Sequence, residues 1–163
     1  EVDYSQVSEY LTSAESELAQ SIAKYGLVDA PEESYVMDCV ARVPGVIAVA
    51  AATEETDTNN LLGKAGSYYA RIVFSYELVG NSSAQGANLV AQGTDCGGSI
   101  EVFNTAEDAE KRSVYLGAFD GTVFASGSHT VIGTVLVRTS DKLTTSQQKE
   151  LEANIIEILT TVS

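Results

Sequence analysis

Apolar residues recur at helical spacing near the start of the chain. Residues 1–26 carry a stripe with steps of three and four residues, which predicts an N-terminal amphipathic helix from about Ser5 to Tyr25. A second helix is expected to begin at Pro31, because proline suits the first helical position, and to end before Pro44-Gly45. The apolar positions of these helices are Val7, Leu11, Ala14, Leu18, Ile22 and Tyr25 in the first, and Val36, Val40 and Val43 in the second.

Two further helices are predicted from capping residues. Thr105 with Asp108 opens a helix that runs through about Gly117. Near the end of the chain, Thr144 or Thr145 is followed three residues later by Gln147 or Gln148, as in a capping box. The apolar face of this last helix consists of Leu151, Ile155, Ile158 and Val162.

Four segments have the composition of strands: residues 46–53, 68–77, 98–103 and 129–138. Residues 68–77 alternate, with one clearly apolar face. Residues 129–138 are β-branched and apolar on both faces, which is typical of a central strand covered on both sides. The intervening helix suggests a parallel, right-handed unit that joins 98–103 to 129–138.

These elements predict a single α+β domain spanning residues 1–163, with the order α-α-β-β-β-α-β-α. We expect a two-layer sandwich in which helices pack on a four-stranded mixed sheet. Residues 79–98 are rich in Gly, Ser, Ala, Asn and Gln, so we expect a long flexible loop there, with at most a helical turn near Ala87 to Ala91. A segment of this kind is where ligand contacts are often found.

Charge excludes some partners. The chain has 163 residues, with 23 acidic against 9 basic side chains and a formal net charge of -14. A nucleic acid needs clustered cations, so it is not an expected partner. The longest apolar run, Val46 to Ala52, is far shorter than the roughly 20 residues that cross a bilayer, so no transmembrane segment is expected.

The cysteines and the first residue bear on the cellular compartment. The sequence begins with Glu1, which is expected if a signal peptide has been removed, so we expect an extracytoplasmic location. Cys39 and Cys96 would then be candidates for one disulfide. Two buried free thiols are the alternative, because neither cysteine has a CxxC partner.

The only histidine gives the sole catalytic hypothesis. His129 follows Ser126-Gly127-Ser128, so either serine is a candidate nucleophile, with Asp120 or Asp95 orienting the imidazole. However, the segment is not a GxSxG elbow, and neighbouring side chains in a strand point to opposite faces. A structural histidine is therefore the competing interpretation.

Oxygen-rich side chains in residues 54–60 suggest a cation site. Glu54, Glu55, Asp57 and Asn59 are the ligand types that calcium prefers, although their spacing differs from that of an EF-hand. A solvated acidic loop is the alternative interpretation. One histidine and two separated cysteines do not make a zinc site, and no phosphate-binding glycine motif occurs, so no cofactor is expected.

Two segments carry a resemblance to known proteins. GTDCGGSIEVF (Gly93 to Phe103) and SGSHTVIGTVLVRTS, followed by LTTSQQKELE, resemble secreted or lipoprotein-type domains of Gram-positive bacteria to which no activity is assigned. The resemblance implies export and attachment to the cell envelope or secretion. It carries over no catalytic residue.

The sequence therefore predicts a non-enzymatic extracytoplasmic domain that binds or interacts with a protein or a small ligand at the cell surface. The alternative is a small extracytoplasmic serine hydrolase centred on His129. No feature of the sequence predicts the oligomeric state.

Overall fold

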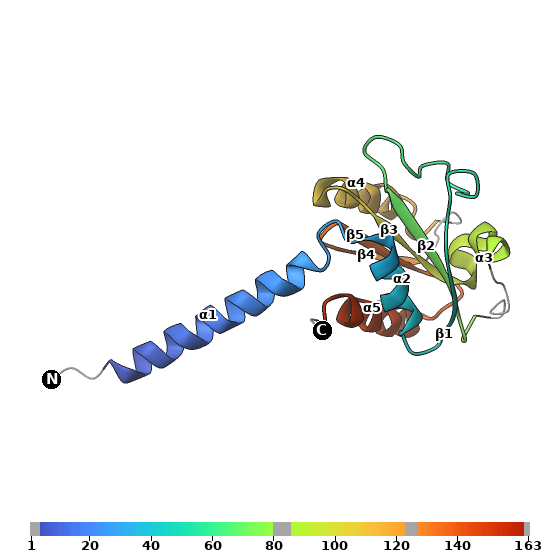
Figure 1. The fold of residues 1–163 in the computed structure, drawn as a ribbon. Coiled ribbons are helices and arrows are strands. Elements are labelled where there is room, and N and C mark those ends of the chain that lie inside the picture. Colours follow the sequence, from blue (N-terminus) through green and yellow to red (C-terminus); the bar gives the residue numbers. More distant parts are fainter. Residues whose placement is uncertain (1–3, 80–85, 123–126, 162–163) are drawn as a thin grey trace.

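Five antiparallel strands form the centre of the molecule (Figure 1). The computed structural model describes residues 4–79, 86–122 and 127–161. Within these ranges the strands lie in the order β1-β2-β3-β5-β4, and each neighbouring pair is antiparallel. Their bounds are β1 (Val46–Ala51), β2 (Ala70–Tyr76), β3 (Gly97–Val102), β4 (Ser128–Ile132) and β5 (Val135–Thr139).

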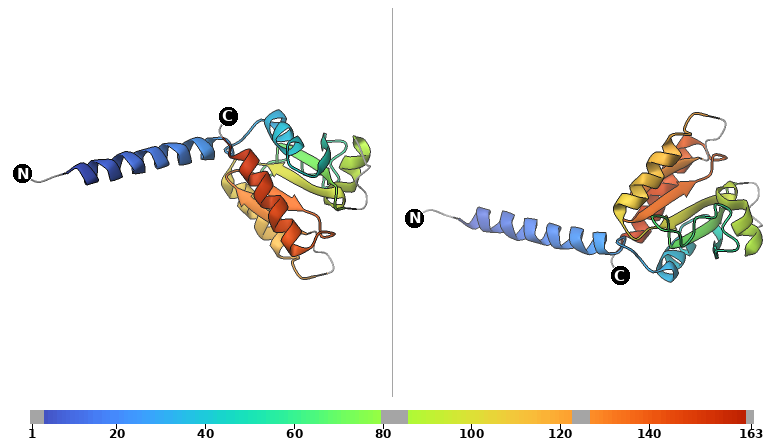
Figure 2. Two further views of the ribbon diagram at one scale, coloured as in Figure 1. Left: turned by 90° about the horizontal axis from the view of Figure 1, so that it is seen from below. Right: turned by 90° about the horizontal axis from the view of Figure 1, so that it is seen from above.

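Helices cover both faces of the sheet, so the body has three layers (Figure 2). α2 (Glu33–Ala41) and α5 (Thr145–Leu159) pack on the first face. α3 (Ala87–Gln92) and α4 (Ala106–Gly117) pack on the second face, where the short 3-10 helix η1 (Gly93–Cys96) leads from α3 into β3. The expected two-layer sandwich was wrong, because the second face also carries enough apolar positions to bury helices.

The first face holds a continuous apolar core. Alternate residues of β2, β3 and β5 point toward α2 and α5, and they are fully buried. The predicted apolar positions Val36, Val40 and Val43 belong to this core, and so do Leu151 and Ile155 of α5. Val162 lies outside the described residues, and Ile158 packs against the core. Its members include Val36, Val40, Ile72, Phe74, Ile100, Val137, Leu151 and Ile155.

The second face is divided. One apolar cluster joins α4 to the sheet through Leu116 and Leu136, and a second joins α3 to the sheet through Leu89 and Val73. Charged side chains of β2, β3 and β5, all of them buried, share the same face: Arg71, Glu101 and Arg138. This division creates the site described below.

Residues 129–138 form a hairpin rather than one strand. β4 and β5 pair with Ile132 opposite Val135, so Gly133 and Thr134 make a two-residue turn. Gly133 has a φ of 58°, and a leading glycine with positive φ is typical of a type II′ turn. The predicted parallel unit was therefore wrong: β3 pairs antiparallel with β5, and the sheet gains a fifth strand.

The helix starts predicted from capping residues are confirmed. Thr105 Oγ1 accepts a hydrogen bond from the N–H of Asp108 at 3.1 Å. Thr144 and Gln147 form a reciprocal capping box at the start of α5. In the segment expected to be a loop, α3, η1 and the start of β3 occupy residues 87–98.

α1 (Ser5–Gly26) projects away from the body (Figures 1 and 2). Its bounds match the prediction, yet none of its residues is buried. The chain joins the body through Val28, whose carbonyl oxygen accepts from the N–H of Thr134 at 2.9 Å. The N–H of Ala30 donates to Thr134 Oγ1 at 2.7 Å, so the β4–β5 turn holds the end of the helix.

Candidate functional site

One side of the site is the loop between β1 and β2, and Asp57 organises it. The buried Asp57 carboxylate accepts from the N–H groups of Leu61 at 2.8 Å and Leu62 at 3.0 Å. The Tyr68 hydroxyl donates to it at 2.8 Å, and Arg71 Nη1 does so at the same distance. These bonds fold the loop back over the sheet.

The same bonds determine how Asp57 titrates. Burial alone raises the pKa of Asp57, but the N–H donors of Leu61 and Leu62 and the Tyr68 hydroxyl outweigh burial and lower the pKa to about 2. Burial also raises the pKa of Tyr68. At neutral pH, Asp57 is therefore a carboxylate and Tyr68 a neutral hydrogen-bond donor.

Glu101 is the second buried carboxylate, and two arginines converge on it. Arg138 Nη1 lies 2.9 Å from Glu101 Oε1, and Arg112 Nε lies 2.9 Å from Oε2. The Glu101 side chain is 0% exposed, whereas those of Arg112 and Arg138 are 13% and 8% exposed. The arginines thus reach from the buried carboxylate to the surface.

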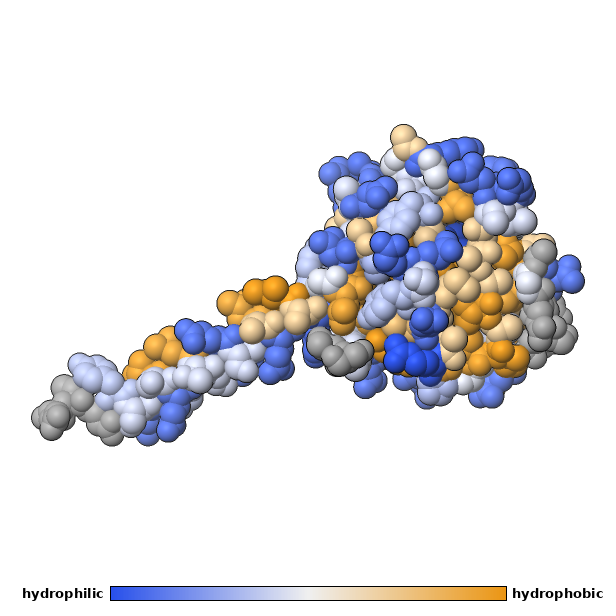
Figure 3. Space-filling model, in the orientation of Figure 1, coloured by the Kyte–Doolittle hydropathy of each residue, from blue (hydrophilic) through white to orange (hydrophobic). Residues whose placement is uncertain are grey.

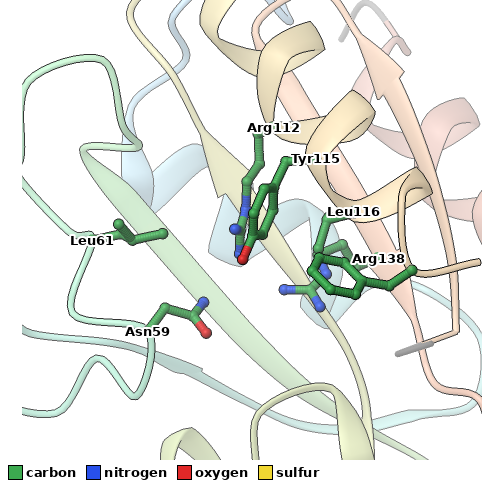
Figure 4. A pocket seen from close by; sticks show the side chains of 7 residues that line it. Asn59, Leu61, Arg112, Tyr115, Leu116 and Arg138 are labelled. Carbon is green, nitrogen blue, oxygen red and sulfur yellow. The ribbon is translucent and has the colours of Figure 1, made fainter. Parts of the chain in front are cut away.

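The arginines open into a cavity of about 700 Å³, which we call the arginine pocket (Figure 4). Its floor comes from β5 and one wall from α4, while the loop held by Asp57 forms the opposite side. Figure 4 shows the guanidinium groups of Arg112 and Arg138 pointing into the space between Asn59 and α4. The lining residues are Asn59, Leu61, Arg112, Tyr115, Leu116, Phe119 and Arg138.

The described ion pairs on this face contain one more guanidinium group than carboxylates. Three arginines (Arg71, Arg112 and Arg138) face two carboxylates (Asp57 and Glu101) in the observed ion pairs. Burial alone lowers the pKa of Arg112, but the charge of Glu101 outweighs burial and raises it, so this guanidinium stays protonated. The pocket is therefore locally cationic in a chain of net charge -14.

Aromatic rings complete the wall. Tyr115 and Phe119 meet edge to face, with centroids 5.2 Å apart. The Arg112 guanidinium carbon lies 5.5 Å from the centroid of the Tyr115 ring, within the range of a cation–π contact. Such a wall holds Arg112 in place and presents an apolar surface next to its charge.

The arrangement suits binding of an anion better than catalysis. Arginine guanidinium groups bind carboxylates and phosphates through paired N–H donors. Among the described residues that line the pocket, none carries a carboxylate, imidazole, thiol or serine hydroxyl. The lining thus combines the two guanidinium groups with the phenol hydroxyl of Tyr115.

The predicted hydrolase residues are partly assembled. Asp120 Oδ2 and His129 Nε2 each lie 3.8 Å from the position that a Cβ would take on Gly117, so both side chains flank the end of α4. Alternate residues of a strand point to the same face of the sheet, so Ser128 and Thr130 share a face. Thr130 contacts Glu152 of α5, so Ser128 lies on the α5 side of the sheet and His129 on the opposite side. Ser126 lies outside the described residues.

Asp95, the alternative orienting acid, lies elsewhere. Its Oδ2 is 3.8 Å from Lys142 Nζ, in the segment before β3. His129 stands opposite Arg138 in the β4–β5 register, at the rim of the polar face. Asp120 and His129 thus both flank Gly117, whereas Ser128, the described candidate nucleophile, lies on the other face of the sheet.

Cys39 and Cys96 are buried free thiols rather than a disulfide. Cys39 belongs to the core under α2, whereas Cys96 lies beneath α3 on the other face of the sheet. The sheet separates them, so the candidate pairing was wrong for this structure. Burial raises the pKa of Cys96, and its Sγ donates to the carbonyl oxygen of Gly93 at 3.1 Å.

The candidate calcium ligands have other partners. Asp57 is saturated by the donors described above, and Glu55 Oε2 accepts from Thr53 Oγ1 at 2.8 Å. Asn59 Nδ2 donates to the Tyr68 hydroxyl at 3.1 Å, and Glu54 Oε1 lies against Gly63. Within residues 4–79, 86–122 and 127–161, no three His, Cys, Asp or Glu side chains are grouped closely enough to hold a metal ion.

No motif in the sequence predicted the arginine pocket. Arg71, Glu101 and Arg138 lie inside otherwise apolar strands, and buried charges are retained only when they are paired. Charged residues at inward-facing strand positions were therefore the available signal. The wall residues Arg112, Tyr115 and Phe119 gave no signal, since on an isolated helix they would be ordinary surface residues.

No described helix combines the length and apolar character needed to cross a membrane. We compared the chain with protein-family models, curated proteins and solved structures. No family model matches it. The curated proteins and the solved structures likewise give no match, so the functional argument depends on the geometry of this chain.

Proposed function

We propose that this protein is a non-enzymatic binding domain that holds a small organic anion in the arginine pocket. The observation that carries the proposal is the convergence of Arg112 and Arg138 on the buried Glu101. Within the described ion pairs, the two guanidinium groups share one carboxylate. This arrangement favours the binding of a further carboxylate or phosphate at the pocket.

The geometry leaves N–H donors for such a ligand. The bonds from Arg112 to Glu101 use Nε and Nη2, and Nη1 has no bond within the described part of the chain. Asn59 adds an amide on the opposite side of the pocket. A ligand anion between them would be bound by donors from both walls.

The walls favour an anion with an apolar group. Leu61, Leu116 and the rings of Tyr115 and Phe119 line most of the remaining surface. A volume of about 700 Å³ lies within the range of small-molecule sites. An aromatic or branched aliphatic acid would match both the charge and the walls.

Isothermal titration calorimetry tests the proposal, with benzoate and phenyl phosphate as first probes. Benzamide is the matched neutral ligand, because it keeps the ring and removes the charge. We expect both anions to bind and benzamide to bind at least about tenfold more weakly, which corresponds to about 1.4 kcal/mol. Equal binding of all three would contradict recognition by the arginines.

Two variants assign the binding to the pocket. Arg112→Gln leaves Glu101 paired with Arg138 and removes the excess charge, so it should weaken anion binding at least about tenfold. Lys111→Gln is the control, since it removes the same charge one residue away, from a side chain that pairs with Glu107 and Asp108 instead. Equal effects of the two variants would indicate a nonspecific charge effect.

An extracytoplasmic location remains part of the proposal, supported by the resemblance to secreted and lipoprotein-type domains. Fractionation of the native cell, with the protein followed by antibody, tests it. Recovery in the cytoplasm alone would contradict this location.

The hydrolase is the second candidate, because Asp120 and His129 flank the same glycine. His129→Ala separates the two functions. A hydrolase would lose turnover of p-nitrophenyl acetate while keeping its fold and its affinity for benzoate, whereas a binding domain would show no turnover to lose.

A further inference from the structure

A row of mostly apolar side chains begins at Tyr4, directly before α1, and runs along one side of this helix. Its members are separated by steps of three and four residues throughout, which is the heptad pattern of a coiled coil. We call this row the seam: Tyr4, Val7, Leu11, Ala14, Leu18, Ser21 and Tyr25. Ser21 is its one polar member, and the exposed Ile22 lies directly beside it. Figure 3 shows apolar side chains along the helix up to the body.

The seam is exposed to water. Leu11 and Leu18 are 59% and 61% exposed, and no residue of α1 is buried. Most helical stability in proteins comes from the packing of an amphipathic face, yet no residue of this 22-residue helix is buried. An exposed apolar face of this length is typical of an interaction surface.

The order of large and small residues in the seam identifies the partner. The first position of each heptad is large (Tyr4, Leu11, Leu18 and Tyr25), and the other core position is small (Val7, Ala14 and Ser21). In a parallel pair of copies, identical positions meet, so overfilled layers would alternate with voids. In an antiparallel pair with Leu11 opposite Ala14, Tyr4 meets Ser21 and Leu18 meets Val7, so these three kinds of layer each combine a larger residue with a smaller one.

Charge selects one antiparallel alignment. When Leu11 packs against Ala14 of the second copy, Glu15 lies beside Ser8 and Glu17 beside Tyr10 of that copy. If the second helix were shifted by one heptad toward the body of the first copy, Glu15 of one copy would face Glu15 of the other, and the two Glu17 side chains would also face each other. Like charges at these flanking positions disfavour that alignment.

The body of the first copy has a hollow at the position where the N-terminal end of the second helix would lie. In the favoured alignment Tyr4 of the second copy lies beside Ser21. A hollow of about 350 Å³ begins there, lined by Ser21, Lys24, Tyr25, Val28, Ile132 and Thr160. The seam therefore continues from α1 onto the body, at the place where Tyr4 of the second copy would arrive.

We propose that two copies of this chain associate through α1 as an antiparallel pair, with Leu11 against Ala14 and Tyr4 in the hollow at the junction of helix and body. The two bodies then lie at opposite ends of the paired helices. The arginine pocket is on another part of the body, so the pairing does not depend on its function.

Sedimentation equilibrium of the full chain gives the first test. We expect twice the chain mass of 17.2 kDa, with dissociation on dilution. Leu11→Glu with Leu18→Glu should weaken the pair at least about 100-fold, because two charges would enter the seam. Ser16→Glu with Ala23→Glu adds the same charge to the outer side of α1 and should leave the mass unchanged. A monomeric parent chain, or equal effects of both double variants, would overturn the proposal.

Single cysteines test the orientation. Tyr4→Cys and Ser21→Cys proteins should form a disulfide with each other when they are mixed under mild oxidation, and neither should do so efficiently alone. A parallel pair would crosslink each variant to itself, which would overturn the antiparallel assignment. The parent chain is the control, because its Cys39 and Cys96 are buried.

Discussion

The two faces of the sheet are built from the same strands but differ in what they bury. The first face is a continuous apolar core under α2 and α5, and its charged member, Glu152, accepts hydrogen bonds from Thr130 and Thr139. The second face buries two ion-paired groups, Asp57 with Arg71 and Glu101 with two arginines. Its apolar clusters are split by these charges.

The difference between the two faces distinguishes side chains that stabilise the fold from side chains that are available for recognition. Apolar burial has no direction, so the first face can stabilise the fold without a precise arrangement of polar atoms. Buried ion pairs add little net stability, because desolvation offsets much of their attraction. Charges retained on the second face are therefore better explained by the arginine pocket than by folding.

The largest expected effect comes from the first face. Phe74→Ala removes a fully buried ring beneath α2 and α5, and should lower the free energy of unfolding by about 4 kcal/mol. Urea unfolding at constant protein concentration measures it. Val114→Ala, at a residue that is 74% exposed on α4, is the control and should stay within about 0.5 kcal/mol of the parent. Similar losses of unfolding free energy in both variants would contradict the assignment of Phe74 to a stabilising core.

On the second face, Glu101→Gln leaves two buried guanidinium groups without their carboxylate. We expect a loss of about 3 kcal/mol, mostly from the uncompensated charge. Adding Arg112→Gln should restore part of that stability, since one guanidinium group fewer then lacks the Glu101 carboxylate. If Glu101→Gln costs as little as an exposed substitution, water already solvates the arginines and the face is not a buried charge site.

Asp57 should make the second face sensitive to acid. Its pKa falls from 3.8 to about 2 on folding, so the unfolded chain binds a proton more readily between these values. The carboxylate then contributes on the order of 2 kcal/mol above pH 4, and this contribution is lost as the pH falls toward 2. Urea unfolding between pH 2 and 5 measures it. Asp57→Asn should flatten the curve in that range, and an unchanged slope would contradict the assignment.

The smallest effect is expected on the surface of α4. Lys111 Nζ lies 2.9 Å from Glu107, the same distance as Arg112 Nε from Glu101. However, both surface partners are mostly exposed, so water and salt screen the pair. Glu107→Gln should unfold at the same urea concentration as the parent. A loss comparable to that of Glu101→Gln would mean that burial does not set the strength of these pairs.

The starts of α4 and α5 were predictable because their signals are local, whereas α2 begins at Glu33, two residues after the predicted Pro31. Thr105 with Asp108, and Thr144 with Gln147, satisfy N–H groups within four residues of sequence, so no tertiary contact is needed to place them. The apolar positions of α2 and β2 were also correct, because each periodicity fits one kind of element.

Other features depended on distant contacts. Gly133 stands in a β-branched run that also fits one strand, and only the pairing of Ile132 with Val135 shows the turn. Strand order likewise depends on which edges meet. Arg112 joins Glu101 only after α4 packs on β5, and Asn59 reaches the pocket only because Asp57 folds its loop back.

The sequence by itself determined the α+β class, the capped starts of α4 and α5, much of the first-face core and the acidic net charge, since these follow from local hydrogen bonds, periodicity and composition. Only the tertiary structure decided the antiparallel order, the separation of the two cysteines, the arginine pocket and the exposure of the α1 seam. Each of these is a relation between residues far apart in the chain. Burial and Coulomb interactions depend on distance in space, which the order of residues does not specify.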